Sequence, residues 1–520
     1  MKIIPDHTDR ITANYWCSWC SQARYLTDEQ RAANSGGRNT RANLTEDFLF
    51  DPEKGLLSAY GFGGCRGDLI ALLDDGWDVP PVDAGAPPRY SDDFGSLILY
   101  ADHFKSIAVP GNPAESLKRL NEKMLSLGYR GLGLWISPQM PRKDHSEWHS
   151  AEEARPYWEE RAEWCRYAGV AYWKIDWGNH CNNAEYLRMM AESCRKYAPG
   201  LLIENAWVRP PVDPLPEERG AEWTEKLGFL KQILGFSDCF RTYDVVGHFE
   251  FVTTLERIAC VFENMPDRPE FPVLGLLSVE HLSYIAAGIG AAQGCMFHEK
   301  NLQCPPLPPE GSCINTWSSS NAIDASHRTL RWNRIAAPFS IFGSENHVSE
   351  EWFTNGLEFN QTKWPFFKGW KAQTGPAALS RNCPLPEAKS AEKDGPRPFV
   401  IASKYPEGPF AVAALPRTLD ADRINVRIPA DVFAYGASAG FPVGVFGVYR
   451  TLTVEFDRDI TGKRVFAQDL LEDEARDCTD AVTIQGRRLV LDGEWIRKIG
   501  LAARTHERDS SDPGLVLVLR

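Results

Sequence analysis

The sequence predicts a (β/α)8 barrel over residues 1–385, followed by an all-β sandwich over residues 386–520. Short apolar runs alternate with amphipathic helical stretches about eight times before residue 300, which is the pattern of a parallel barrel. After about residue 385 the helical period is lost, and short runs of alternating polarity follow. A length of 520 residues also exceeds what one ordinary core accommodates, so two domains are expected.

Eight apolar runs are the expected barrel strands. Each is four to eight residues long, as buried strands usually are. They are residues 14–20, 69–73, 131–137, 170–175, 201–204, 236–243, 273–277 and 291–297. The stretches between them carry apolar residues at helical spacing, which predicts the outer helices. The expected helices are residues 113–127, 151–167, 183–197, 249–262, 279–287 and 325–335.

The polar, proline-containing segment at residues 384–396 reads as a linker. The runs beyond it alternate in polarity without a helical period, so we expect an antiparallel sandwich. The expected sandwich strands are residues 399–402, 410–414, 424–428, 443–449, 452–456, 489–491 and 514–519.

Composition narrows the class of partner. The formal net charge is -13, the pI is about 5.5, and there is no long basic run, which argues against nucleic acid or an anionic membrane. A neutral oligosaccharide or glycoside fits this charge. The 17 tryptophans supply indole faces of the kind that stack on sugar rings. With no apolar leader at the N-terminus and no 18-residue apolar span, a cytoplasmic location is expected.

The 13 cysteines are scattered along the chain. Cys17 and Cys20 form a C-x-x-C pattern inside an apolar, tryptophan-flanked run, with no second such pattern nearby. We interpret them as buried thiols, with a redox or zinc pair as the alternative.

Acidic residues lie at the ends of four expected strands. In barrels of this class the chemistry takes place at the C-terminal strand ends, so these acids are the first candidates for a site. They are Asp74, Asp75, Asp176, Glu204, Asp238 and Asp244. Trp77, Trp177 and Trp207 stand close to three of these ends, and carboxylates with indoles are the side chains of a polyhydroxyl-binding cleft.

Asp176 is the strongest single candidate. Lys174 and Asp176 are two residues apart on an expected strand, so both should point to the same side. An ammonium beside the carboxylate would keep Asp176 ionised, as a nucleophile or an electrostatic stabiliser must be. A structural ion pair is the alternative.

Two carboxyls that face each other across a pocket suit glycoside hydrolysis, and a separation of about 5 Å implies a retaining mechanism. Clustered acids could instead hold a metal ion. His145 and His149 are four residues apart but lack the H-E-x-x-H order, so we expect no metal and no cofactor. Unrelated barrel chemistry, such as an isomerase that uses His298, is a further alternative.

Four motifs resemble those of glycoside hydrolase clan D, which holds families 27 and 36, the α-galactosidases and α-N-acetylgalactosaminidases. They are Leu-Asp-Asp-Gly-Trp at 73–77, Gly-Leu-Gly-Leu-Trp at 131–135, Tyr-Trp-Lys-Ile-Asp at 172–176 and Phe-Arg-Thr-Tyr-Asp at 240–244. The segment 14–19 is a looser match to the first strand of the clan. The resemblance covers about residues 14–300, and a β-sandwich after the barrel also matches.

The resemblance implies roles for individual residues. Asp176 matches the nucleophile and Lys174 a sugar-binding lysine. Asp74 and Asp75 match the pair that binds galactose hydroxyls. Asp244 matches the acid/base, Trp77 an aromatic position beside the Asp74–Asp75 pair, and Arg241 a sugar-contacting arginine. Apart from these matches, four further side chains are expected to contact the sugar: Trp16, Trp135, Trp177 and Glu204.

Several positions depart from the clan pattern. Trp177-Gly178 follows Asp176 where family 27 usually has Asn-Cys, the Arg241-to-Asp244 spacing is one residue shorter, and Gln139 replaces an acid of family 36. These departures indicate a divergent member whose sugar differs more readily than its chemistry.

Asp238 is the alternative acid/base. Six residues separate Asp238 from Asp244, about 20 Å along one strand, so only one of them can reach a bond held at Asp176. Asp244 is favoured because it ends the sixth run, and Asp238 takes the role if that strand ends at Ser237.

The sequence therefore predicts a retaining exo-acting α-glycosidase, α-galactosidase-like, that works by double displacement. The alternatives are a transglycosidase of the raffinose-synthase type, another clan specificity (α-N-acetylgalactosaminidase, β-L-arabinopyranosidase or α-glucan-active), and a sugar-binding protein without catalysis.

Overall fold

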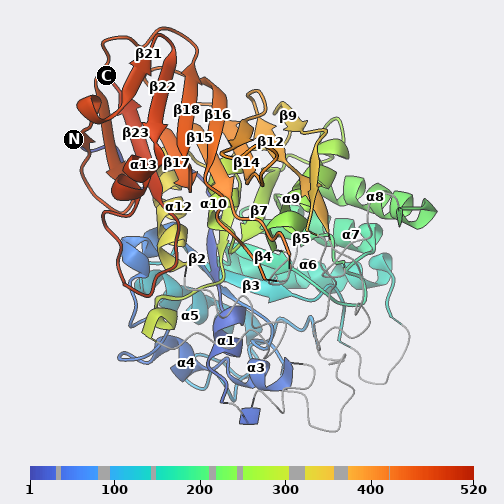
Figure 1. Ribbon diagram of the computed structural model, residues 1–520. Coiled ribbons are helices and arrows are strands. Elements are labelled where there is room, and N and C mark those ends of the chain that lie inside the picture. Colours follow the sequence, from blue (N-terminus) through green and yellow to red (C-terminus); the bar gives the residue numbers. More distant parts are fainter. Residues whose placement is uncertain are drawn as a thin grey trace.

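The computed structural model describes residues 1–27, 29–30, 37–79, 94–141, 148–209, 218–242, 250–303, 322–355, 373–420 and 422–520. Figure 1 shows a barrel built from the blue-to-green part of the chain, with a β-rich part in orange and red against one side of it. The predicted barrel and sandwich are confirmed.

The barrel strands follow the order of the sequence, and β8 pairs with β1 to close the ring. All pairs in the ring are parallel, and helices cover the outer face. The strands are β1 (Tyr15–Cys17), β2 (Ile70–Leu73), β3 (Leu132–Ile136), β4 (Tyr172–Ile175), β5 (Leu202–Ala206), β6 (Cys239–Arg241), β7 (Leu276–Glu280) and β8 (Ala292–Cys295).

Most barrel helices begin and end within a residue or two of the prediction. Local signals account for this: Asn112 caps α5 with a proline in the first turn, Ser150 and Glu153 form a capping box on α6, and Gly169 ends α6 in the left-handed conformation. The helices are α5 (Pro113–Ser126), α6 (Ala151–Ala168), α7 (Ala184–Tyr197), α8 (Ala221–Leu234), α9 (Glu250–Glu263), α10 (Ser283–Ile289) and α12 (Ile323–Ile335).

Two differences from the predicted elements shape the site. The expected helix at 279–287 was wrong at its start, because Val279 and Glu280 still pair with Gln293 and Gly294 of β8. The expected first strand at 14–20 was too long, because the chain leaves the sheet after Cys17 and turns into α1. The sequence reading also missed α8 and the short segments before β2, which are α1 (Trp19–Arg24), α3 (Arg38–Ala42), α4 (Glu46–Phe50) and the 3-10 turns Phe62–Gly64 and Arg66–Asp68.

The C-terminal part contains an eight-stranded and a five-stranded sheet, ordered β20-β19-β23-β17-β15-β14-β12-β9 and β13-β16-β18-β22-β21. The sheets are mixed, because β12–β14, β15–β17 and β16–β18 are parallel pairs. Its strands are β9 (Asn346–Val348), β12 (Ala378–Arg381), β13 (Glu387–Ser390), β14 (Phe399–Lys404), β15 (Phe410–Leu415), β16 (Ala430–Ala437), β17 (Val443–Gly447), β18 (Thr451–Phe456), β19 (Val465–Asp469), β20 (Arg476–Asp477), β21 (Thr483–Gln485), β22 (Arg488–Asp492) and β23 (Gly514–Leu519). A separate pair, β10 (Trp352–Thr354) and β11 (Thr374–Pro376), and the helix α13 (Gly493–Gly500) complete it.

The expected strand at 424–428 forms no named strand; its Val426 makes one isolated bridge to Arg417. The segment expected as a linker contains β13, which pairs with β16. Strands β9 and β12 precede residue 385 in the chain, yet they hydrogen-bond into the same sheet as β14. The domain boundary at 385 stays a prediction.

The barrel and the sandwich share a hydrophobic core. Helix α10 packs against β14, β15 and β17, and α12 packs against β23. The Arg328 guanidinium of α12 is paired with Asp469 at 2.8 Å, and neither side chain is exposed to solvent. A fully buried charge pair of this kind restricts how the two parts can sit against each other. None of the helices in the described ranges is long and apolar enough to cross a membrane.

Candidate active site

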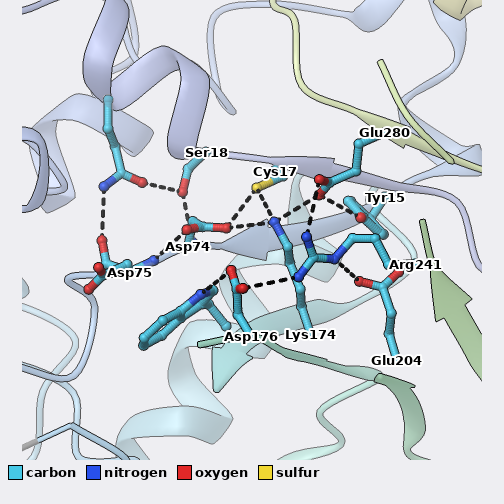
Figure 2. A network of polar contacts seen from close by, with 12 residues as sticks. Tyr15, Cys17, Ser18, Asp74, Asp75, Lys174, Asp176, Glu204, Arg241 and Glu280 are labelled. Carbon is cyan, nitrogen blue, oxygen red and sulfur yellow. Dashed lines mark hydrogen bonds and ion pairs between the residues drawn. The ribbon is translucent and has the colours of Figure 1, made fainter. Parts of the chain in front are cut away.

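Charged side chains line the barrel at the C-terminal ends of its strands (Figure 2). Two cations, Lys174 from β4 and Arg241 from β6, lie among carboxylates from β2, β4, β5 and β7. Those carboxylates are Asp74, Asp176, Glu204 and Glu280. Buried charges are stable only when they are paired, so this network fixes the side chains of the site relative to one another.

Asp176 follows the last residue of β4. The indole N–H of Trp135, on the neighbouring strand β3, donates to its Oδ2 at 2.9 Å, and Nη2 of Arg241 lies 3.3 Å from its Oδ1. The side chain is 9% exposed, whereas that of Arg241 is 0% exposed. Asp176 is thus a carboxylate with two fixed partners at the rim of the barrel.

The cation beside Asp176 was expected to be Lys174, and the structure shows Arg241 instead. Lys174 Nζ lies 3.0 Å from Asp74 Oδ2 and 2.8 Å from Glu280 Oε1. Residues two apart on a strand are separated by about 6–7 Å along its axis, so Lys174 lies one layer deeper than Asp176. Its ammonium therefore forms ion pairs with Asp74 after β2 and with Glu280 of β7.

A cysteine thiol contacts both members of the Lys174–Asp74 pair. Cys17 of β1 donates to Asp74 Oδ2 at 3.0 Å and lies 3.6 Å from Lys174 Nζ. Burial alone would lower the pKa of the Lys174 ammonium, but the negative charges around it, Asp74 first, outweigh burial and raise that pKa well above its usual range. Lys174 is therefore charged at any physiological pH.

Asp75 has its own cation. Arg41 of α3 donates through Nε to both Asp75 oxygens at 2.9 Å. Burial raises the pKa of the Asp75 carboxyl, and Arg41 opposes that effect. Gly76 makes the approach possible: its φ is 109°, and a Cβ there would lie 2.9 Å from Arg41 Cα. Because Gly76 of the Asp-Asp-Gly-Trp motif has no side chain, Arg41 can come close enough to pair with Asp75, the second acid of the motif.

Arg241 links the other acids. Its Nε donates to Glu204 Oε1 at 3.1 Å, and its Nη1 donates to Glu280 Oε2 at 3.5 Å. Tyr15 donates to Glu280 Oε1, and Tyr172 donates to Glu204 Oε2, both at 2.8 Å. Glu204 lies within β5 rather than at its end, so it is fully buried below the rim.

Burial affects these two glutamates differently. Burial raises the pKa of Glu204, with Arg241 opposing. Burial would also raise the pKa of Glu280, but Lys174 and Arg241 together outweigh it and hold that pKa at about 2. Glu280 is therefore the carboxylate that compensates both cations at once.

The predicted tryptophans divide into two groups. Trp135 and Trp177 lie beside Asp176 and pack with Phe94 in one small cluster. Trp77 and Trp16 are 0% exposed. The Trp77 indole donates to the Trp135 carbonyl at 2.9 Å, which supports β3 from behind.

Trp16 faces away from the barrel interior, since its neighbours Tyr15 and Cys17 are the inward residues of β1. It packs against Phe62 and His298.

Of the two acid/base candidates, Asp238 and Asp244, only Asp238 lies in the described part of the chain. Asp238 precedes β6, at the opposite end of the strand from the rim; its Oδ2 accepts from the Ile203 N–H at 3.1 Å, and its Oδ1 lies 3.3 Å from Arg195 Nη2. The structure does not bring it to Asp176. Asp244 lies outside the described residues.

The isomerase alternative depended on His298. This side chain is fully buried among aromatic rings, and burial lowers its pKa to about 3. In the described ranges, no three His, Cys, Asp or Glu side chains form a group that could hold a metal ion; His145 lies outside those ranges. Cys17 and Cys20 are both buried thiols, as expected.

Sequence reasoning missed Glu280, Tyr15, Cys17 and Arg41. Glu280 ends an apolar run and was detectable by the strand-end rule, but residues 279–287 also have helical spacing. Tyr15 and Cys17 carry no local signal, because their partners are remote in sequence: closure of the barrel beside β8 brings Tyr15 to Glu280, and pairing of β1 with β2 brings Cys17 to Asp74.

No protein-family model matches the chain, and no curated protein matches it significantly. Among solved structures, it is similar to a variant of a family 27 β-L-arabinopyranosidase from Geobacillus stearothermophilus in complex with arabinose, at 10% identity and TM-score 0.40, covering 98% of this chain and 97% of that chain. It is similar to a candidate α-N-acetylgalactosaminidase from Bacillus halodurans C-125, at 12% identity and TM-score 0.37, covering 99% of both chains. A candidate α-galactosidase/melibiase from Bacteroides fragilis follows, at 13% identity and TM-score 0.37, covering 99% of this chain and 80% of that chain.

Proposed function

We propose that the protein is a retaining exo-acting α-glycosidase, α-galactosidase-like, that removes terminal sugars by double displacement. The observation that carries the proposal is Asp176: a carboxylate directly after a barrel strand, at the C-terminal rim, held by Trp135 and Arg241. A nucleophile of this reaction must be fixed in direction, and the two partners orient the Asp176 carboxylate.

In this proposal Asp176 attacks the anomeric carbon and forms a glycosyl-enzyme intermediate, which water then hydrolyses. Asp244 protonates the departing oxygen and later deprotonates the water, as the Arg241-to-Asp244 motif implies. The negative charge on Asp176 also stabilises the oxocarbenium character of both transition states.

The Asp74–Asp75 pair suits the hydroxyls of the bound sugar. Each carboxylate offers about four acceptor directions, of which internal donors take only some. Lys174 and Arg41 hold the two side chains in place, so a hydroxyl that binds there gains a hydrogen bond without reorganising the site.

Trapping of the intermediate tests the nucleophile. An activated 2-fluoro glycoside should label the protein once, and peptide mapping should place the label on Asp176. We expect Asp176→Asn to lower the rate of the chemical step at least about 100-fold and to prevent labelling. Asp238→Asn, a second buried aspartate of the same barrel, is the matched control and should still be labelled. A label on another carboxylate would refute the assignment.

Leaving-group dependence tests the acid/base. Protonation matters little for a dinitrophenolate and greatly for a sugar alkoxide, so Asp244→Ala should lose far more activity on a disaccharide than on a dinitrophenyl glycoside. Azide should restore turnover of the activated substrate, because it attacks the intermediate without a general base. Azide rescue of Asp238→Ala, and not of Asp244→Ala, would move the role to Asp238.

A further inference from the structure

A cavity of about 290 Å³ lies between the barrel and the sandwich. The barrel contributes Glu250 at the start of α9 and the turn after β7 that contains His281. The sandwich contributes Asn425, Arg427 and the segment before β23 that contains Asp512. We call this space the interface cavity. His281, which lines the cavity, directly follows Glu280 of the charge network in the sequence. The volume of the cavity is at the lower end of the range for small-molecule sites.

Polar side chains from both parts of the protein converge on Glu250. Asn425 Nδ2 donates to Glu250 Oε1 at 3.3 Å, and His281 Nε2 lies 3.3 Å from Glu250 Oε2. His281 and Asn425 have φ angles of 43° and 47°, in the left-handed region where His and Asn are among the more frequent non-glycine residues. One loop from each part of the protein thus places a polar side chain against the same carboxylate.

The rest of the lining supplies both kinds of hydrogen-bonding group and two apolar walls. Arg427 Nε donates to Asp512 Oδ1 at 2.6 Å, so one cation offsets one of the two carboxylates that line the cavity. Phe251 and Phe297 provide apolar surface. A strongly anionic ligand would be repelled by Glu250, and a purely apolar one would form no hydrogen bond with the polar lining. Mixed donors and acceptors around aromatic walls suit a neutral, polyhydroxylated ring.

We propose that the interface cavity is a second carbohydrate-binding site, which holds one neutral glycosyl unit through Glu250, His281 and Asn425. The unit is either a distal part of a bound oligosaccharide or a free sugar, since both present the same hydroxyls. The proposal does not depend on the proposed reaction, because binding here involves neither Asp176 nor its partners.

The test is a count of bound sugars per chain. Calorimetric titration and ligand-observed NMR with galactose, glucose, arabinose and a linear trisaccharide would compare the wild-type chain with two cavity variants. Glu250→Gln removes the central charge at nearly constant volume, and Ser510→Trp fills the cavity from an exposed lining position. Glu455→Gln, a carboxylate paired with Arg487 and Arg488 on the sandwich surface, is the matched control.

We expect the wild-type chain and Glu455→Gln to bind one more sugar than Ser510→Trp, and Glu250→Gln to bind that sugar about tenfold more weakly. The difference between the wild type and Ser510→Trp measures the interface cavity whatever the catalytic site binds, so it is separate from the proposed function. Binding of monosaccharides identifies a free sugar as the ligand. Binding of the trisaccharide alone, with a raised KM for long substrates only, identifies a distal substrate unit.

Equal stoichiometry and affinity in the wild type and both cavity variants would overturn the proposal, as would a wild-type chain that binds none of these sugars. Thermal melts of each variant confirm that it is folded. If Ser510→Trp fails to fold, Glu250→Gln alone decides, because unchanged affinity in that variant contradicts the role of Glu250.

Discussion

Replacement of Glu280 by glutamine tests the charge network most directly. The Glu280 carboxylate is the only group in Figure 2 that contacts both Lys174 and Arg241, at 2.8 Å and 3.5 Å. Glutamine keeps the volume and the hydrogen bond from Tyr15 but removes the charge. The two buried cations would then share one carboxylate fewer.

The size of the effect follows from the pKa of Glu280. An ordinary glutamate pKa of 4.5 falls to about 2 in the folded protein, a difference that corresponds to about 3 kcal/mol in the free energy of unfolding. Because the folded-state pKa is lowered, this stabilisation is present above pH 4.5 and is lost as the pH falls from 4.5 toward 2. Removal of one partner from a buried charge pair costs about 3–5 kcal/mol, which agrees with this value.

Urea unfolding followed by tryptophan fluorescence at pH 7 and pH 3 measures this effect. We expect Glu280→Gln to unfold about 3–5 kcal/mol more easily than the wild type at pH 7, and the gap to narrow at pH 3. Glu455→Gln should differ from the wild type by less than about 1 kcal/mol, because its arginine partners are largely exposed.

The same variant should also lose activity. With Glu280 uncharged, Arg241 is held less firmly between its carboxylates, and the direction of Asp176 depends on Arg241. Equal unfolding free energies for Glu280→Gln and wild type at pH 7, or a gap that stays constant down to pH 3, would refute Glu280 as the shared counter-charge.

Three further predictions concern neighbouring positions. Arg41→Gln leaves Asp75 buried without its ion-pair partner, so it should lower the free energy of unfolding by about 3–5 kcal/mol in urea titrations, and a loss below about 1 kcal/mol would contradict the pairing. Gly294→Ala places a Cβ 2.8 Å from Tyr15 Oη and from Glu280 Cγ, so it should lower kcat/KM and the melting temperature, whereas Gly200→Ala, with nothing within 4 Å, should change neither. Asp238→Ala removes the acceptor of the Ile203 N–H and should lower the melting temperature while kcat stays within a few-fold of wild type; a loss of turnover would contradict its structural role.

The spacing of apolar residues along the sequence was enough to predict most of the barrel. The runs that became β2, β3 and β4 are apolar, short and bounded by turn residues, and their ends were predicted to within two residues. Val279 and Glu280 were misassigned to a helix because an apolar run such as residues 276–289 satisfies the spacing of a buried strand and of a buried helix equally. Pairing with β8 resolves that ambiguity, and such pairing is not visible in local sequence.

The candidate site was likewise predictable in part from local sequence and in part only from strand pairing. Asp74, Asp75 and Asp176 were predictable because an acid after a buried apolar strand is unusual enough to indicate a function. Their partners were not: Lys174 was expected beside Asp176, yet its nearest carboxylates come from β2 and β7. Trp16 and Trp77 looked like sugar-stacking residues, yet both are sealed within the protein.

By itself, the sequence determined the barrel, the sandwich and the strand-end acids, because each depends on periodicity or on the chemistry of neighbouring residues. Only the tertiary structure decided which cation meets which acid. Tyr15 and Glu280 are 265 residues apart and meet because barrel closure places β1 beside β8, and β8 beside β7. Charge pairing depends on distances of a few ångströms between side chains, and local sequence holds no information about such distances between remote strands.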